Sequence, residues 1–345
     1  MSLLQETCDA IRGRSHEIEQ HIIDNWNAGS SVEQYGRLVN VVAQYGAATN
    51  QEHLTVPKPC MIIASADHGV ADMGVSAYPK ETTVGMTQNY LIPKGAGANS
   101  LANYCGAQME VIDMGIDADM SWVPGLRSHK LGMGTKNFVE EPAMTREQAI
   151  EGIETGISLV KEKIDEGFNV FLVGEMGISN TTASALMTAK FAGLTAEEAT
   201  GRGTNISDER LKLKQRIVHD VLEKYKNIPK DDAIGILSSV GGFEFTCIVG
   251  VILGAAANNA LVIIDGFNTS ACALVAKTLV PQAMDYVMAS HLSAEKAAKS
   301  SLENLGLEAY VDLGLCLGEA SGGSIQMGML DLAVHMYLAV TGGKA

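Results

Sequence analysis

Residues 171–182, FLVGEMGISNTT, combine residue types that can bind a nucleotide. The segment begins as an apolar run, is interrupted by Gly174 and Gly177, and resumes behind Ser179 with a helix-like sequence. A glycine-rich turn into a helix N-terminus presents free N–H groups to an anion, usually a phosphate. Glu175 lies inside the turn, where a carboxylate suits ribose hydroxyls or a cationic ring. The alternative is a tight strand-to-helix connection with a polar N-cap.

A second glycine turn, residues 201–205 (GRGTN), precedes a helical pattern that carries Lys214. A lysine one or two turns into such a helix can act as a point charge on a phosphate. The neighbouring Lys212 and Arg216 support the alternative, a basic helix face in contact with water.

Glu319 follows an apolar segment and precedes the small residues ASGG. A carboxyl group against a wall formed by Leu313, Leu315 and Leu317 would have its pKa raised by desolvation. A general base that works near neutral pH needs such a shift. The alternative is a residue in the first turn of a helix, where a negative charge favours the helix dipole.

Alternating helical and strand patterns indicate how these groups are positioned. Helices between successive strands require parallel crossovers, so the sequence predicts an α/β fold with a doubly wound, Rossmann-like parallel sheet and a smaller helical domain. We expect strands at 59–65, 109–115, 168–174, 233–238, 260–265, 284–290 and 309–313, with surface segments at 117–143 and 194–203. We expect helices at 1–29, 32–50, 82–105 (interrupted near Pro93 and Gly95), 145–166, 180–192, 208–226, 243–258, 268–278, 293–304 and 324–340.

Three segments follow from this pattern. We expect residues 1–55 to form a small helical domain and residues 56–320 an α/β domain, with a C-terminal helix in 321–345 that packs with the small domain.

Composition excludes several classes of protein. The net charge is −15 and only 5% of residues are aromatic, so we expect no nucleic-acid partner. The six cysteines form no C-x-x-C pair and the histidines no H-x-x-x-H pair, which predicts reduced core thiols and no metal site. No apolar run is long enough to span a bilayer and the N-terminus lacks an apolar signal core, so we expect a cytoplasmic protein with no membrane contact.

Seven short motifs occur in a characteristic order. They are ADHG at 66–69, GEMGISNTT at 174–182, GRGT at 201–204, GGFE at 241–244, DGF at 265–267, SHLSAE at 290–295 and LGLCLGE at 313–319. From about residue 35 to the end, the chain resembles the nicotinate-nucleotide:dimethylbenzimidazole phosphoribosyltransferases of cobalamin assembly. Each motif is weak alone, but seven in order are specific.

The resemblance implies an activity and a set of site residues. That family transfers 5-phosphoribose from nicotinate mononucleotide to an aromatic base, releases nicotinate, and needs no metal or redox cofactor. Members are typically dimers, so a homodimer or a heterodimer with a paralogue is implied here. Matched by motif, Glu319 corresponds to the general base, and Glu175 and Gly177 correspond to the nucleotide-binding turn. Gly203 and Lys214 correspond to the phosphate region. Asp265 and Ser293 match donor-side positions, and Leu317 lines the acceptor side.

The acceptor side departs from the family pattern. Gly85 stands where many members have a glutamine that can bind a benzimidazole nitrogen, and Tyr78 stands where serine is common. With Met86, these residues are expected to line the acceptor pocket. Some relatives use phenol or p-cresol, which have one oxygen to bind and no second ring nitrogen. The hypothesis is therefore a phenol-accepting or broadly accepting enzyme, and the alternative is a non-catalytic or partner subunit of the same fold.

Overall fold

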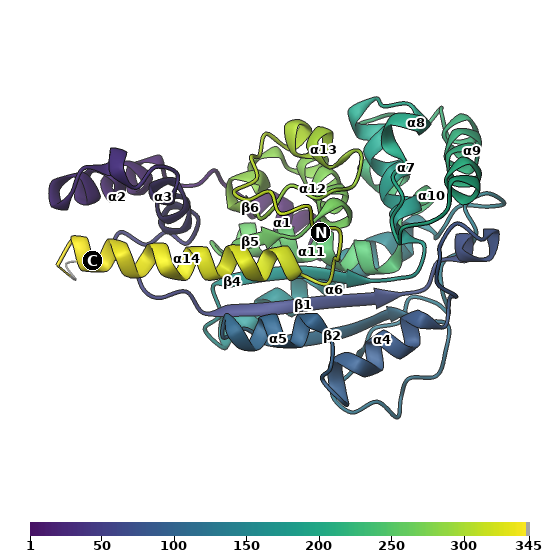
Figure 1. Ribbon diagram of the computed structural model, residues 1–345, viewed down its shortest axis with the longest axis horizontal. Helices are drawn as coiled ribbons and strands as arrows, with labels where there is room; N and C mark the ends of the chain where they lie inside the picture. Colours follow the sequence, from purple (N-terminus) through teal and green to yellow (C-terminus); the bar gives the residue numbers. More distant parts are fainter. Residues whose placement is uncertain (343–345) are drawn as a thin grey trace.

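A six-stranded parallel sheet forms the centre of the computed structural model, which describes residues 1–342. The strand order is β3-β2-β1-β4-β5-β6, and every pairing is parallel. The chain moves outward from β1 to β3 and then from β4 to β6, so its direction reverses between the neighbours β1 and β4 (Figure 1). The predicted α/β fold with a parallel sheet is confirmed. The strands are β1 Pro59–Ala66, β2 Gln108–Gly115, β3 Arg127–Ser128, β4 Val170–Met176, β5 Leu261–Ile264 and β6 Val287–Ala289.

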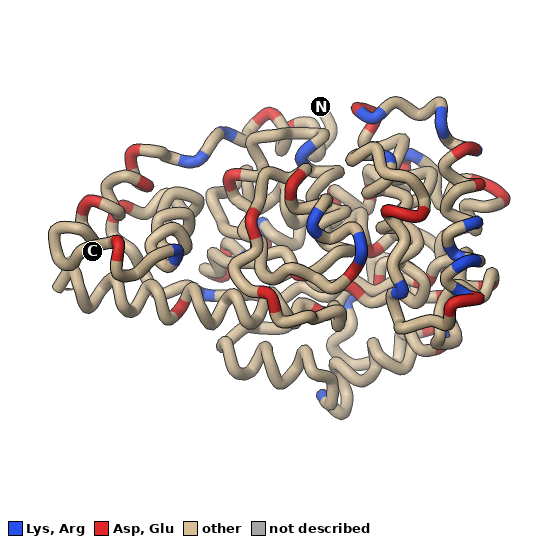
Figure 2. The backbone as a smooth tube through the Cα atoms, turned by 45° about the horizontal axis from the view of Figure 1, so that its top comes forward, with Lys and Arg blue, Asp and Glu red and all other residues tan. Residues whose placement is uncertain are grey.

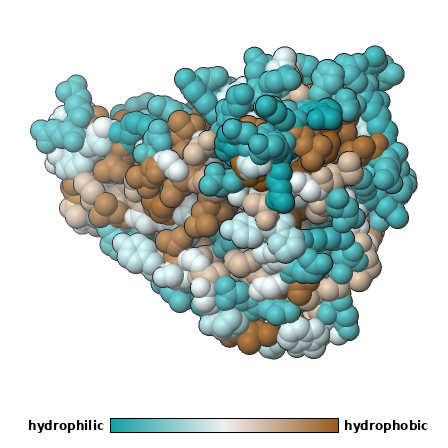
Figure 3. Space-filling model, turned by 45° about the vertical axis from the view of Figure 1, so that its right-hand side comes forward, coloured by the Kyte–Doolittle hydropathy of each residue, from teal (hydrophilic) through white to brown (hydrophobic). Residues whose placement is uncertain are grey.

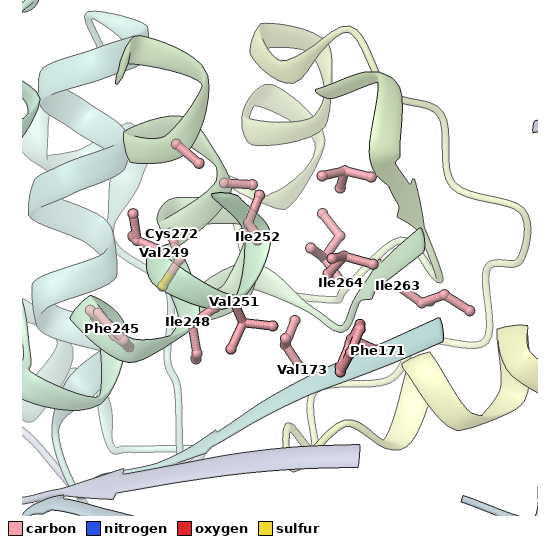
Figure 4. Close-up of a cluster of buried hydrophobic side chains, with 14 of the residues drawn as sticks. Phe171, Val173, Phe245, Ile248, Val249, Val251, Ile252, Ile263, Ile264 and Cys272 are labelled. Carbon is pink, nitrogen blue, oxygen red and sulfur yellow. The ribbon is translucent and has the colours of Figure 1, made fainter. Parts of the chain in front are cut away.

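Helices cover the sheet and account for its apolar strands. Every residue of β1 and β4 is buried, as expected of parallel strands with both faces covered. Helices α11 (Phe243–Ala257) and α12 (Phe267–Leu279) contact each other and the central strands, and their side chains gather with Phe171 and Val173 of β4 (Figure 4). Leu172 of β4 faces α14 (Ser321–Val340), where Gly323 approaches it.

The remaining helices extend these two layers. On the side of α14, α4 and α5 contact β2, and α5 contacts α14; on the other side, α6 packs along α11 (Figure 1). Helices α7 to α11 form the long crossover between β4 and β5. Their bounds are α4 Thr82–Leu91, α5 Gly97–Tyr104, α6 Arg146–Asp165, α7 Asn180–Ala192, α8 Ala196–Ala199, α9 Asp208–Lys224, α10 Ala233–Val240 and α13 Ala298–Leu305.

The N-terminal helices lie in two places. Helix α1 (Leu3–Ala10) packs on α6 and α11, and the amide of Leu4 donates a 3.0 Å hydrogen bond to Glu154. Helices α2 (His16–Gly29) and α3 (Leu38–Ala48) pack on each other and on α14, where Trp26 meets the edge of Tyr337. The division into 1–55, 56–320 and 321–345 stays a prediction.

Two predicted strands are wrong. Residues 233–238 belong to helix α10, because Asp232 caps it by accepting a 2.9 Å hydrogen bond from the amide of Gly235. A short apolar run fits a buried strand or a buried helix equally well, and the cap decides between them. Residues 309–313 contribute only one bridge to the sheet, between His291 and Val311.

Other differences concern the ends of elements. The predicted helices 1–29 and 82–105 are each two helices, the second pair separated near Pro93 as expected. Segment 117–143 contains the short β3, and segment 194–203 contains α8. The predicted strand 284–290 begins as a 3₁₀ turn, Pro281–Tyr286, and the predicted helix 293–304 starts only at Ala298.

Acidic and basic positions are interspersed along the chain, and several basic positions lie along α9 (Figure 2). Within residues 1–342, no helix combines the length and the apolar character that a bilayer crossing requires.

Helices α6 and α11 approach each other closely through glycine. A Cβ atom at Gly156 would lie 2.1 Å from the carbonyl oxygen of Cys247, and one at Gly250 would lie 2.0 Å from that of Ile153. Both neighbours are backbone atoms, which cannot rotate away. The contact between the two helices therefore requires glycine at these positions.

We expect Gly156→Ala to lower the free energy of unfolding by about 1–3 kcal/mol, the usual cost of overpacking. Gly85→Ala is the matched control, because a Cβ there meets no atom within 4 Å. Alanine favours a helix over glycine, so the control should gain up to about 1 kcal/mol. Urea unfolding of the two variants measures both values, and an equally stable Gly156→Ala protein would contradict the close packing.

Candidate active site

A cavity of about 540 Å³ opens beyond the carboxyl ends of β4, β5 and β6. Parallel α/β sheets bind ligands at this edge, near the point where the strand order reverses. Figure 3 brings this side of the molecule forward and shows hydrophobic residues exposed among hydrophilic ones. Nine predicted site residues line the cavity: Tyr78, Met86, Glu175, Gly177, Gly203, Asp265, Ser293, Leu317 and Glu319.

Glu175, the last residue but one of β4, lines the cavity and is held by two asparagines. Asn180, the first residue of α7, donates to Glu175 Oε2, and Asn268 donates a 3.0 Å hydrogen bond to Asn180 Oδ1. Burial raises the pKa of Glu175 to about 7, the two asparagines oppose the shift, and the charges of Glu244 and Asp265 add to it. Its carboxyl group can therefore change protonation near neutral pH.

Gly174, within β4, and Gly177, directly after it, permit close packing. A Cβ at Gly174 would lie 2.6 Å from the amide nitrogen of Ala320, and one at Gly177 would lie 2.6 Å from the carbonyl oxygen of Ala66. Ser179 has a φ of +77° and its side chain caps no amide. Gly174 thus lets β4 approach the start of α14, and Gly177 lets the turn approach the end of β1. The simple polar N-cap is wrong.

Glu319 precedes α14 in a run of left-handed residues. The φ values are +83° at Gly318, +59° at Glu319 and +58° at Ala320. Such a conformation costs roughly 1–2 kcal/mol per non-glycine residue, and such residues cluster at functional sites. Glu319 therefore lies outside the helix, which begins at Ser321, and its carboxyl group lines the cavity.

Asp265 at the end of β5 fixes the start of α14. Its Oδ1 accepts hydrogen bonds from the amides of Gly322 (2.6 Å) and Gly323 (3.2 Å). Burial raises the pKa of Asp265, while the charge of His291 and the helix amides act against that shift. Asp265 thus places the segment that carries Glu319.

The expected leucine wall around Glu319 is wrong. Leu313 and Leu317 are each 58% exposed, and of the three leucines only Leu317 lines the cavity. These residues lie in an extended surface loop, so their alternation does not indicate a buried face. Burial still raises the pKa of Glu319, the neighbouring Tyr90 hydroxyl opposes the shift, and Asp265 adds to it. Cys316 is exposed on the same loop, so the expectation of a core thiol is wrong for this cysteine.

Lys214 lies beneath the second glycine turn. The residue is buried, so the alternative of a water-exposed basic face is wrong for Lys214. Its Nζ donates to Thr181 Oγ1 (2.8 Å) and to the carbonyl oxygen of Gly201 (3.4 Å). Burial lowers the pKa of Lys214 to about 8, and the charge of Glu295 opposes that shift. Lys214 does not itself line the cavity but contacts Thr181, which does.

Helix α4 forms part of another wall. Thr82 and Met86 line the cavity together with Tyr78, which is 57% exposed in the preceding loop. Gly85 is exposed and is not among the lining residues, so the structure does not place it in the pocket as predicted. Its lack of a side chain leaves the adjacent space open.

Sequence reasoning missed several polar residues of the site. Asn180, Thr181, Thr204, His291 and Glu295 line the cavity and lie inside the seven motifs, so the motifs carried the signal. Asn268 directly follows the DGF motif. Within residues 1–342, no group of three or more His, Cys, Asp or Glu side chains is placed to hold a metal ion.

The site combines two carboxyl groups with a buried lysine beside a glycine turn, and it lies at the carboxyl edge of a parallel sheet. This combination is typical of an enzyme that acts on a phosphorylated sugar. The profile of a family described as "Phosphoribosyltransferase" matches residues 14–343. The chain belongs to the family of nicotinate-nucleotide–dimethylbenzimidazole phosphoribosyltransferases.

Relatives and solved structures agree on this family. The "Nicotinate-nucleotide--dimethylbenzimidazole phosphoribosyltransferase" of Geobacter sulfurreducens is 42% identical, covering 90% of this chain and 88% of its own. That of Geobacter metallireducens is 40% identical, covering 97% and 95%. The crystal structure of CobT from Thermus thermophilus superposes with a TM-score of 0.88 at 33% identity, covering 93% and 96%.

We expect the stability of the protein to depend on the ionisation of Glu175. The pKa of this carboxyl is about 7 in the fold against an ordinary 4.5. Between these values the folded state binds more protons than the unfolded chain, so stability falls as pH rises. The loss amounts to roughly 3 kcal/mol at about 1.4 kcal/mol per pH unit.

Glu175→Gln should remove this loss, because glutamine can still accept from Asn180 but cannot ionise. Urea unfolding at pH 5 and pH 8 measures the effect, with the exposed Glu140→Gln as the matched control. An unchanged pH dependence in Glu175→Gln would contradict the assignment.

Proposed function

We propose that this chain transfers 5-phosphoribose from nicotinate mononucleotide to an aromatic acceptor and releases nicotinate. The observation that carries the proposal is the pairing of two carboxyl groups in one cavity. A Cβ at Gly318 would lie 3.0 Å from Glu175 Oε1, so Glu175 faces the segment that holds Glu319. The family relationship supports the same reaction, since the relatives are named for nicotinate nucleotide and dimethylbenzimidazole.

In this proposal the donor phosphate binds at the turn of residues 201–205. The left-handed Gly203 lines the cavity, and the ammonium of Lys214 lies behind it through Thr181. A cation and a glycine turn form a suitable phosphate site even in an acidic protein, because the local field decides. Ser293, whose hydroxyl accepts from the amide of Glu295 (3.3 Å), lines the same part of the cavity.

Carboxylates suit the chemistry at the anomeric carbon. The bond from that carbon to the pyridinium nitrogen breaks, its electron pair stays on nitrogen, and nicotinate leaves with a neutral ring. The ribose gains oxocarbenium character, which Glu175 can stabilise in its ionised form. The acceptor attacks the opposite face, the β bond becomes an α bond, and Glu319 takes the acceptor proton. Holding both ligands in line lowers the barrier further.

The acceptor in this proposal is an aromatic base or a phenol. The space beside Gly85 holds no amide that could bind a benzimidazole nitrogen, while Tyr78 and Met86 offer apolar surface. A phenol proton has a pKa near 10, against about 4.3 for an ordinary glutamate. The raised pKa of Glu319 narrows that gap, and transfer concerted with bond formation removes the rest.

The partner subunit is also part of the proposal. Helix α14 carries an at least partly exposed stripe of Ile325, Gly328, Met329, Leu332 and Met336, and the 83% exposed Tyr104 lies against Gly328. An apolar stripe of this kind supports a dimer, of identical chains or with a paralogue.

We further propose a cytoplasmic location. The competing function is a non-catalytic partner subunit, which would keep the fold but not depend on Glu319.

We expect Glu319→Gln to lower the turnover number about 10²- to 10⁴-fold, because the proton acceptor is lost. Nicotinate mononucleotide should still bind, since its proposed contacts are elsewhere. Nicotinate release and calorimetric titration measure the two effects, with Asp312→Asn on the exposed part of the same loop as control. Undiminished turnover would remove Glu319 from the reaction, and no turnover by the wild type, alone or with a paralogue, would favour the partner subunit.

Phenol and dimethylbenzimidazole distinguish the acceptor classes. We expect the wild type to form an α-riboside phosphate from phenol, and Gly85→Gln to raise the preference for the benzimidazole about three- to tenfold through one added hydrogen bond. Gly85→Ala is the control, because it adds no amide. Chromatography of competition reactions measures the ratio. No product from phenol, alone or with any paralogous partner chain, would reject the phenolic acceptor.

A further inference from the structure

Two loops that line the cavity are joined by the hydroxyl group of Thr204. Thr204 Oγ1 accepts a 2.9 Å hydrogen bond from the amide of Ala77 and lies 3.2 Å from Ser76 Oγ. Ser76 Oγ in turn accepts from the amide of Tyr78 at 3.2 Å. A continuous hydrogen-bonded path therefore leads from the glycine turn at 201–205 to the aromatic residue at the acceptor side, although Thr204 and Ser76 are 128 residues apart in the sequence.

The loop that carries Tyr78 is anchored at its start by the buried Val75, and its exposed end is fixed by side-chain hydrogen bonds. Residues 75–78 belong to no helix or strand, and their amides and carbonyls make no backbone–backbone hydrogen bond. The side chain of Tyr78 is 57% exposed, so packing does not hold it either. Apart from Thr204, the polar contact to this loop is from Arg210, whose Nη1 donates to the carbonyl oxygen of Ser76 at 2.5 Å. Beyond the anchor at Val75, the position of Tyr78 therefore depends on residues of the turn and of α9.

The other end of the path is the candidate phosphate turn. Gly203 and Asn205, on either side of Thr204, have φ values of +56° and +59°. The amide of Gly203 donates to Glu295 Oε1 (2.8 Å), and a Cβ at Gly203 would lie 3.4 Å from Lys214 Nζ. An anion that takes the place of Glu295 Oε1 at this amide, beside the ammonium of Lys214, acts directly on the backbone that carries Thr204.

We propose that Thr204 is a positioning residue that couples occupation of the phosphate turn to the placement of Tyr78 at the acceptor side. The identification of the two ligands as a sugar phosphate and an aromatic acceptor rests on the proposed function. Binding of the sugar phosphate fixes the turn, the turn fixes Ser76 and Ala77, and the acceptor then meets a formed pocket. Coupling of this kind is reciprocal, so the acceptor strengthens binding of the sugar phosphate by the same factor.

The test uses ligands that cannot react. Ribose 5-phosphate occupies the donor side without a leaving base, and the dissociation constants of phenol and dimethylbenzimidazole are measured by ligand-observed NMR with and without it. We expect ribose 5-phosphate to tighten acceptor binding about three- to tenfold in the wild type, the strength of one or two neutral hydrogen bonds. Thr204→Val keeps the shape of the side chain but removes the hydrogen bonds to Ala77 and Ser76. The dissociation constants of the acceptor with and without ribose 5-phosphate should then be about equal in this variant.

Two further variants make the result specific. Ser76→Ala keeps the hydrogen bond from Ala77 to Thr204 and should lose only part of the coupling; it also replaces Thr204→Val if that variant fails to fold. Thr278→Val removes a hydroxyl that donates to the carbonyl oxygen of Leu274 (2.8 Å), at the end of α12 remote from the cavity-lining Thr269, and should keep the full coupling. Thermal unfolding checks that each variant is folded.

The outcomes separate this proposal from the proposed function. The ratio compares the acceptor dissociation constants without and with ribose 5-phosphate. An equal ratio in Thr204→Val and in the wild type overturns the coupling. A wild-type ratio of one for both acceptors also overturns it, including the case in which neither acceptor binds. Nicotinate release from nicotinate mononucleotide is followed in parallel. Its absence with every acceptor overturns the proposed function, whereas the ratio with unreactive ligands tests only the role of Thr204.

Discussion

The hydrogen bonds from the amides of Gly322 and Gly323 to Asp265 are the constraint on which the site depends. They join the end of β5 to the first turn of α14, and they hold the three left-handed residues before that helix. A buried carboxylate is costly unless it is hydrogen-bonded, and the positive end of a helix is a favourable partner for it. One interaction thus secures a helix that packs on β4 and β5 and places Glu319 opposite Glu175.

A high density of acidic groups surrounds this junction. Besides Glu175, Asp265 and Glu319, the fully buried Glu244 is paired at 2.6 Å with His68. Burial lowers the pKa of His68, but the charge and hydrogen bond of Glu244, together with nearby carboxylates, outweigh burial and raise it. Carboxylates that repel one another are stabilised when a cation forms among them, so the site favours a substrate carbon that becomes positive in the reaction. The charges of Glu244 and Asp265 also add to the effect of burial, which raises the pKa of Glu175 to about 7.

The sequence was sufficient for features that local pattern or motif order determines. The parallel sheet follows from alternating elements. Nine predicted site residues, seven of them within the motifs, line one cavity although they span Tyr78 to Glu319. It was insufficient where long-range contacts decide. The apolar run in α10 fits a strand as well as a helix, and the alternating leucines before Glu319 lie on an exposed loop. Burial of Lys214 depends on the fold of a turn whose Gly201 lies 13 residues away.

The two sides of the cavity differ in how firmly they are built. Glu175, Asp265, Ser293 and Lys214 are all buried and hydrogen-bonded, so the donor side has one arrangement. The acceptor side is formed by the exposed Tyr78 and Leu317 on loops, beside a glycine with open space around it. A rigid site discriminates strongly between ligands, whereas an exposed apolar wall tolerates differences of shape. The fold therefore favours one fixed sugar phosphate and a range of aromatic acceptors, because changing the acceptor requires altering only surface loops.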